Sequence, residues 1–159
     1  MYLYFCDENN KFTEDLKNLM LKAFEIVLRN EFNDTEINID SLPVEASVSI
    51  VTNDEIKELN NEYRGIDNPT DVLSFPQFES KNDFIKNASE DTENLLGDVV
   101  ISFEKALSQA EEYGTGITRE AVYLFTHSIF HLLGYDHMTD EDKKIMRAKE
   151  EMVMEELSL

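Results

Sequence analysis

The segment 118–133 is apolar on nearly every side of the helix that its sequence favours. Its apolar residues are spread around the whole helix instead of forming one stripe: Ala121, Val122, Leu124, Phe125, Ile129, Phe130, Leu132 and Leu133. A helix that is hydrophobic all round must be covered by other elements. We therefore expect this segment to form the central helix, with the rest of the chain folded around it.

Four segments have the composition of β-strands. They cover residues 1–6, 44–51, 70–78 and 97–103. Each is rich in β-branched or aromatic residues or alternates apolar and polar ones, a pattern typical of strands that pack on at least one face. Pro76 cannot donate a hydrogen bond to a neighbouring strand, so we expect the third strand to lie at a sheet edge or to end there.

Apolar residues at helical spacing predict four further helices. They cover residues 13–32, 54–63, 102–113 and the segment from 139 to the C-terminus. Thr13 is suited to cap the first, and Thr139 with Asp142 forms a capping pattern for the last. Residues 79–94 are polar, and we expect a mobile excursion there. The sequence thus predicts one α+β domain over residues 1–159, with a mixed sheet of about four strands packed with about five helices.

Length and composition suit a compact cytoplasmic protein. The chain has 159 residues, of which 42% are hydrophobic, enough to form one core. The single cysteine, Cys6, excludes an internal disulfide, and its apolar neighbours predict a buried position. No apolar run approaches membrane-spanning length, and the N-terminus lacks the pattern of a secretion signal. We therefore expect a soluble cytoplasmic protein that does not contact a membrane.

The chain is strongly acidic. Its 34 Asp and Glu residues against 14 Lys and Arg give a formal net charge of −20 at pH 7, which opposes nonspecific attachment to nucleic acid or anionic lipid. We expect the acidic patches at 89–94 and 149–156 to be solvent-exposed surface. A function on nucleic acid would need local cations or a partner that supplies the attraction. The available cations include Arg64, Lys81, Lys86, Lys105 and Arg119.

All three histidines of the chain lie within eleven residues, at positions 127, 131 and 137. His127 and His131 are four residues apart on the central helix, so their side chains lie within ~40° of one face and about 6 Å apart along the axis. Gly134 is a typical helix terminator, because it accepts a left-handed backbone. The chain can then reverse and return His137 to the same face.

Three converging imidazoles with one open position match the ligand arrangement of catalytic zinc. The alternative is that the histidines are ordinary core residues, but buried imidazoles without a metal would each need hydrogen-bond partners. We therefore predict one metal ion held by His127, His131 and His137. Zinc is the first candidate, while nickel, cobalt and copper are also compatible with nitrogen ligands.

The spacing of the histidines also equals that of the metzincin proteases, which have a glutamate general base directly after the first histidine. Ser128 occupies this position. A serine hydroxyl does not accept a proton at neutral pH as a carboxylate does, so peptide hydrolysis by that route is disfavoured.

Three blocks of the sequence resemble the YbeY-type endoribonucleases, a family of bacterial ribosomal-RNA maturation factors. "HSIFHLLGYDH" (127–137) resembles the signature His-Gly-x-x-His-Leu-x-Gly-Tyr-Asp-His. "NNEYRGIDNPTDVLSFP" (60–76) and "LGDVVIS" (96–102) resemble two further segments of that family in the same order and spacing. The resemblance covers essentially the whole chain. The sequence departs from the family signature at Ser128, where the family usually has glycine. This difference bears on packing and not on metal binding.

The resemblance implies an α+β fold, zinc bound by the three histidines, and cleavage of single-stranded RNA. It further implies a role in ribosomal-RNA maturation, at the 3′ end of 16S RNA, and in ribosome quality control, with the ribosome or its proteins as partners. Arg64 lies in the second matching block, and its planar fork suits a phosphate. We therefore expect Arg64 and His127 to be catalytic. The alternative for Arg64 is a surface arginine at a helix C-terminus.

Other polar residues leave several interpretations open. Asp71 and Asp98 suit strand-entry hydrogen bonds, or could orient a ligand or a water molecule. Asp136, beside the third histidine, could orient a ligand ring or cap the turn. No general base is assigned. Two other functions remain open: a noncatalytic zinc-stabilised module that binds ribosome or assembly proteins, and a metal-dependent hydrolase of another substrate.

Overall fold

The computed structural model describes residues 1–159 and contains four strands, as expected. The strands are β1 (Tyr2–Cys6), β2 (Val44–Val51), β3 (Val72–Pro76) and β4 (Asn94–Ser102). The helices are α1 (Glu14–Phe32), α2 (Asn53–Arg64), α3 (Lys81–Asn87), α4 (Phe103–Tyr113), α5 (Ile117–Leu132) and α6 (Asp140–Glu156), with a short 3-10 helix, η1 (Ile39–Ser41). The predicted α+β class is confirmed, with one helix, α3, more than the five expected.

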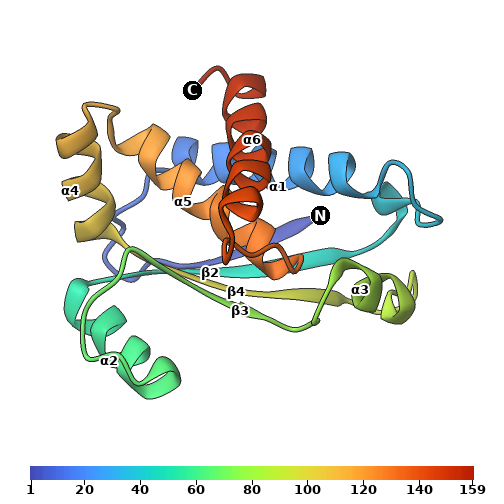
Figure 1. Cartoon of the computed structure of the whole chain (residues 1–159), viewed down its shortest axis with the longest axis horizontal. Coiled ribbons are helices and arrows are strands. Elements are labelled where there is room, and N and C mark those ends of the chain that lie inside the picture. The colour runs from blue at the N-terminus through green and yellow to red at the C-terminus, as the bar shows by residue number, and fades with distance from the viewer.

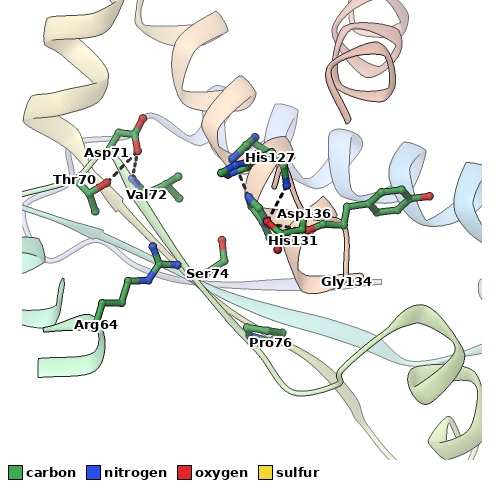
Figure 2. A pocket seen from close by; sticks show the side chains of 12 residues that line it. Arg64, Thr70, Asp71, Val72, Ser74, Pro76, His127, His131, Gly134 and Asp136 are labelled. Atoms are coloured by element: carbon green, nitrogen blue, oxygen red, sulfur yellow. Dashed lines mark hydrogen bonds between the residues drawn. The ribbon is translucent and has the colours of Figure 1, made fainter. Parts of the chain in front are cut away.

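The sheet is mixed, with the strand order β1-β2-β4-β3. Strands β1, β2 and β4 are parallel to one another, and β3 runs antiparallel to β4 at the edge. Pro76 pairs with Gly97 at the end of β3, so the predicted edge position is confirmed. The free edge of β3 is the edge at which the candidate site lies, as Figure 2 shows.

Helix α5 is the central element of the helical layer. It contacts α1, α4 and α6 as well as strands β3 and β4. Figure 1 shows α1, α5 and α6 on one face of the sheet, while α2 lies on the opposite face. The side chains of Phe125, Ile129 and Leu132 are fully or almost fully buried. The all-round apolar character of this segment therefore reflects contacts on several sides, as predicted.

Local capping signals fix the ends of the helices that carry site residues. Thr52 and Glu55 form a capping box at the start of α2, and Gly65 ends that helix with a left-handed backbone, φ 69°. Thr139 and Asp142 form the predicted capping box at the start of α6. These boundaries set where Arg64, the last residue of α2, leaves the helix.

The expected excursion over residues 79–94 is wrong for its first half, which forms α3. Ser80 caps this short helix by accepting a hydrogen bond from the backbone N–H of Asp83. Phe84 is fully buried and packs edge-on against Phe32 and Phe78. A single aromatic anchor holds this helix, which is too short to show a helical period in the sequence.

The expectation that Cys6 is buried is also wrong. Cys6 is exposed, because it lies on the same face of edge strand β1 as Tyr2 and Tyr4, which are more than half exposed. Alternation along the strand sends Leu3 and Phe5 toward the core instead. None of the helices combines the length and the apolar character needed to span a membrane.

Candidate metal centre

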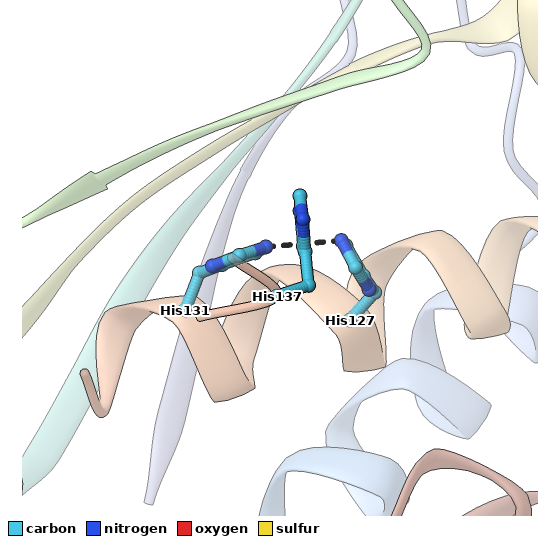
Figure 3. A group of neighbouring side chains, drawn as sticks. All are labelled: His127, His131 and His137. Atoms are coloured by element: carbon cyan, nitrogen blue, oxygen red, sulfur yellow. Dashed lines mark hydrogen bonds between the residues drawn. The ribbon is translucent and has the colours of Figure 1, made fainter. Parts of the chain in front are cut away.

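His127 and His131 stand one turn apart on the face of α5 that faces the cavity. Their Nε2 atoms are 3.0 Å apart, and both side chains are half-buried. The first prediction from the histidine spacing, that these two rings lie together, is confirmed. Figure 3 shows the two rings directed toward each other.

A sharp turn after α5 returns the third histidine to the pair. Gly134 has φ 92°, and the Tyr135 N–H donates to the carbonyl of Phe130 as the helix ends. A side chain at Gly134 would have its Cβ 3.0 Å from the Cα of Ser80, a tight contact in addition to the strain of the positive φ. The ring of His137 then lies 5.0 Å from that of His131, centre to centre. One nitrogen from each of the three rings lies within 4.8 Å of the others.

Hydrogen bonds fix the tautomers of the two rings on α5. The Nδ1 atom of His127 is 2.5 Å from a carboxylate oxygen of Glu150, and that of His131 is 2.8 Å from the carbonyl oxygen of Tyr135. Both partners are acceptors, so each Nδ1 carries the proton and each Nε2 presents a lone pair. Two lone pairs therefore face each other across 3.0 Å.

This donor set fits a divalent transition metal. Burial lowers the pKa of His131, and the nearby His127 lowers it further, which disfavours a proton shared between the two Nε2 atoms. A cation beside the lone pairs removes their repulsion, and neutral imidazole nitrogens are preferred ligands of zinc. An acceptor behind each ligating ring is also the usual outer partner of metal-bound histidines.

Glu150 is the residue of the candidate site that sequence reasoning missed. Its side chain is buried, with the residue 2% exposed, and it also accepts a hydrogen bond from the Tyr123 hydroxyl. Burial and this bond raise the pKa of Tyr123. The expectation that residues 149–156 are solvated surface is wrong at this position, because Glu150 shares the buried face of α6 with Met146 and Val153. Their spacing of four and three residues was the available signal.

Asp136 takes the second of its two predicted roles. Its carboxylate accepts a hydrogen bond from the backbone N–H of His137 at 2.7 Å and therefore stabilises the turn. The carboxylate that contacts a ligand ring comes instead from Glu150 on α6.

A second buried glutamate, Glu31 of α1, contacts the turn that follows α5. It accepts hydrogen bonds from the Tyr135 hydroxyl at 2.7 Å and from Nζ of Lys149 at 2.6 Å, and Nζ of Lys81 lies at 3.5 Å. Burial alone would raise the pKa of Glu31, but the bonds from Lys149 and Tyr135 outweigh it and the pKa is lowered. Because the carbonyl of Tyr135 faces His131, this cluster connects α1 to the orientation of that ring.

A cavity of about 600 Å³ opens in front of the histidines. It lies between the exit turn of α5 and strand β3, and its wall includes the three histidines and Arg64. Arg64 is exposed at the end of α2, as its surface alternative also predicted, and its side chain lies across the cavity from the histidines, as Figure 2 shows. The structure thus brings all four predicted site residues to one cavity.

The other candidate cations are not part of this cavity. Lys81 contacts Glu31, and Arg119 pairs with Glu151 at 3.1 Å. Lys86 and Lys105 are also absent from the cavity wall. Arg64 is therefore the only one of the five candidates that lines it.

The aspartates near the site make structural hydrogen bonds. One carboxylate oxygen of Asp71 accepts from the N–H of Val72 at 2.7 Å and the other from the side chain of Gln109 at 3.1 Å, although Asp71 also lines the cavity. Asp98 accepts a hydrogen bond from the Ser47 hydroxyl. The strand-entry interpretation is thus supported for Asp71.

Ser128 is fully buried beside the cluster. Its hydroxyl oxygen lies 2.6 Å from that of Ser74 on β3. The departure from the glycine of the family signature therefore adds a hydrogen bond between α5 and the edge strand. The hydroxyl points to another serine and not to the histidines, so it replaces no protease base.

The fold and the site together define a small α+β protein with a three-histidine candidate metal centre and an arginine across its cavity. The family model described as endoribonuclease YbeY matches residues 4–158. The chain belongs to the YbeY endoribonuclease family, and the resemblance of its three sequence blocks is thereby confirmed.

Similar proteins agree with this assignment. A protein of Thermoanaerobacter sp. (strain X514) named endoribonuclease YbeY is 50% identical over 149 residues, which cover 91% of this chain and 89% of the relative. One of the same name from Caldicellulosiruptor saccharolyticus is 49% identical over 137 residues, with coverage of 85% and 87%. A solution structure of a Thermotoga maritima protein has a TM-score of 0.60 at 25% identity and covers 99% of this chain and 92% of that one.

Proposed function

We propose that this protein is a metal-dependent endoribonuclease that cleaves single-stranded RNA in the cytoplasm. Its role would be the maturation of ribosomal RNA at the 3′ end of 16S RNA, together with ribosome quality control, so ribosomal RNA and ribosomal proteins are its proposed partners. The observation that carries the proposal is the convergence of three imidazoles on a cavity that a guanidinium lines from the other side. Membership of the YbeY family supports the same activity.

His127, His131 and His137 would hold one zinc ion, or another divalent transition metal, through one nitrogen each. When bound, such an ion supplies a Lewis acid that polarises a phosphoryl oxygen and makes a water molecule more acidic. Glu150 keeps Nε2 of His127 available as a ligand by accepting a hydrogen bond from the protonated Nδ1 of the same ring. The Tyr135 carbonyl does the same for His131.

Arg64 would bind the phosphate that is cleaved. The planar guanidinium of an arginine offers two parallel N–H donors to phosphate oxygens. Because it projects from the end of α2 across the cavity, it can approach the phosphate from the side opposite His127. In this arrangement Arg64 stabilises charge that develops on the phosphoryl oxygens. His127 would act as one of the three ligands that hold the metal ion on the other side of the phosphate.

The strong acidity favours a second candidate, a noncatalytic metal-stabilised module that binds ribosome or assembly proteins. A formal net charge of −20 suits basic partners better than RNA. This candidate predicts the same metal content as the enzyme but no cleavage of RNA.

The test is cleavage of labelled single-stranded and double-stranded RNA by purified protein of measured metal content. We expect cleavage of the single strand, and a loss of at least about 100-fold in kcat/KM for Arg64→Ala. Lys57→Ala is the matched control, because it removes a cation from the same helix outside the cavity. Circular dichroism verifies that each variant is folded.

If the folded, metal-loaded protein cleaves neither single-stranded nor double-stranded RNA, the nuclease function is excluded and the noncatalytic binding module is supported. Equal activity of Arg64→Ala and Lys57→Ala would remove the phosphate-binding role of Arg64. Cleavage of a different ester or an amide by the same preparation would indicate a hydrolase of another substrate.

A further inference from the structure

A second hollow adjoins the histidine cluster. It has a volume of about 370 Å³ and lies between α5 and the first turns of α6. It shares Asp71, His127 and His137 with the cavity that Arg64 lines, so these histidines stand between the two spaces. We call the second space the α5–α6 groove. Its other lining residues are Tyr123, Leu124, Lys143, Met146, Arg147 and Glu150.

Two cations line the α5–α6 groove. Lys143 and Arg147 are four residues apart on α6 and therefore lie on one side of that helix. Both are exposed, and the side chain of Arg147 is 68% exposed. Arg147 contacts Glu151 at 3.5 Å, an exposed ion pair that contributes little and leaves the guanidinium available to a ligand.

The floor of the groove is apolar. Leu124 and Met146 line it with side chains that otherwise belong to the core. The guanidinium of Arg147 lies 5.7 Å from the ring centre of Tyr123, so a flat cation covers an aromatic ring at the wall. Nucleic-acid bases stack on such aromatic and guanidinium planes, and they bind apolar surfaces when single-stranded. The groove therefore offers surfaces for a base beside cations for a phosphate.

The two carboxylates that line the groove, those of Asp71 and Glu150, already accept hydrogen bonds from neighbouring groups. Glu150 is turned inward, where it contacts His127 and accepts a hydrogen bond from Tyr123. Its carboxylate forms no ion pair with Lys143 or Arg147. In a chain with 34 acidic and 14 basic residues, the cations of the two adjoining spaces are Arg64, Lys143 and Arg147.

We propose that the α5–α6 groove is a nucleotide subsite for single-stranded RNA, an inference that rests on the proposed function and extends it. Lys143 and Arg147 bind a phosphate of the strand, and the adjoining base lies on the floor formed by Leu124 and Met146. The strand spans the histidine cluster, with Arg64 at one side and the groove at the other. RNA is thus held by a local line of cations although the molecule as a whole repels it.

The test compares a Lys143→Ala/Arg147→Ala double variant with the wild-type chain in steady-state cleavage of a fluorescently labelled single-stranded RNA. We expect KM to rise roughly tenfold while kcat stays within about twofold, because the subsite binds the strand away from the cleaved bond. The plot of log(kcat/KM) against log salt concentration should become less steep by about 0.7, the change expected when one phosphate contact on a single strand is lost.

Lys144→Ala is the matched control. Lys144 is exposed and adjoins Lys143 on the same helix, but it lines neither space. Its KM and salt slope should stay near the wild-type values. If the double variant and Lys144→Ala have equal KM and equal slopes, or if kcat falls while KM is unchanged, the subsite is refuted and the endoribonuclease function stands. If the wild-type protein neither binds nor cleaves RNA, both proposals fail.

A second comparison uses a substitution that should lower KM instead of raising it. Glu151→Gln removes the carboxylate that contacts Arg147 and should lower KM by about two- to threefold. Glu155→Gln makes the same change of charge one turn further along α6 and should have a smaller effect. Equal effects of the two substitutions on KM would show that KM responds to the overall charge of the protein and not to the contact with Arg147. If the alanine variants prove less stable, Lys143→Gln and Arg147→Gln replace them, with the same expected change in KM.

Discussion

A carboxylate oxygen of Glu150 lies 2.5 Å from Nδ1 of His127, across 23 residues of sequence and between two different helices. Helix α5 supplies the ring, and α6 supplies the acceptor that fixes which ring nitrogen is free. The state of the candidate metal centre thus depends on how α6 packs against α5. This dependence leads to the first prediction.

Replacing Glu150 with glutamine should weaken metal binding by about 10- to 100-fold, because the carboxylate that makes His127 a better ligand is lost. Zinc affinity measured by competition with a chromophoric chelator checks this. Glu155→Gln, an exposed position on the same helix, is the control and should bind zinc like the wild type. Equal affinities for Glu150→Gln and the control would show that Glu150 has no role in the centre.

Metal should stabilise the folded chain. Zinc at about 100 times its Kd contributes about 2.7 kcal/mol, which raises the Tm of a domain of this size by about 5–10 °C. Scanning calorimetry of chelator-treated protein, with and without added zinc, measures the shift. Mg²⁺ should produce almost none, because it prefers oxygen ligands. The zinc shift should disappear in His131→Ala, and a shift of the same size in that variant would place the ion elsewhere.

Acid should remove the contribution of the buried cluster around Glu31. The pKa of Glu31 is lowered in the folded state, so its stabilisation is present above its unfolded pKa of about 4.3 and is lost as pH falls through the folded value. Glu31→Gln should lower the free energy of unfolding by about 1.5–3 kcal/mol at pH 7. Urea unfolding at a series of pH values should show this difference shrinking below pH of about 4.

The control for this experiment is Glu25→Gln. Glu25 lies on the same helix, and its ion pair with Arg29 is exposed, so its replacement should change stability by less than about 1 kcal/mol at any pH. If the loss in Glu31→Gln were constant from neutral to acid pH, the charge of Glu31 would not be the source of the stabilisation.

Ser128→Ala should retain cleavage. The hydroxyl of Ser128 forms a hydrogen bond with the side chain of Ser74, away from the histidines, so its loss should reduce stability by about 1 kcal/mol and change kcat by less than about twofold. Single-turnover cleavage and urea unfolding measure the two effects. In the Ser74→Ala/Ser128→Ala double variant both partners are gone, so the added cost should be small. A loss of 100-fold in kcat for Ser128→Ala would assign the hydroxyl to the chemistry.

The part of the site that the sequence predicted is the part encoded locally. Helical spacing brings His127 and His131 together, and Gly134 permits the reversal that returns His137. Residues that act across long sequence distances were missed, as the contact between Tyr135 and Glu31 shows, since 104 residues separate them. Helix α3 was missed for another reason: one buried aromatic, Phe84, holds a seven-residue helix that has no visible period.

Glu150 was missed although its position carried a signal. The acidic composition of the last segment indicated surface, whereas the spacing from Met146 to Val153 placed Glu150 on the covered side of α6. Periodicity therefore predicted its environment better than charge did. The strands and most helix boundaries followed from periodicity and capping residues alone, because both act within a few positions along the chain.

The adjacent residues Lys149 and Glu150 give α6 a role in the timing of assembly. Lys149 binds Glu31 on the first helix, and Glu150 binds His127 on the fifth. During synthesis, both attachments must wait until translation has passed α6, after every other element has emerged. A nascent chain that lacks this helix has no acceptor for Nδ1 of His127, so the tautomer of that ring is not fixed. The histidine cluster therefore gains its full set of hydrogen bonds only when α6 packs against α1 and α5.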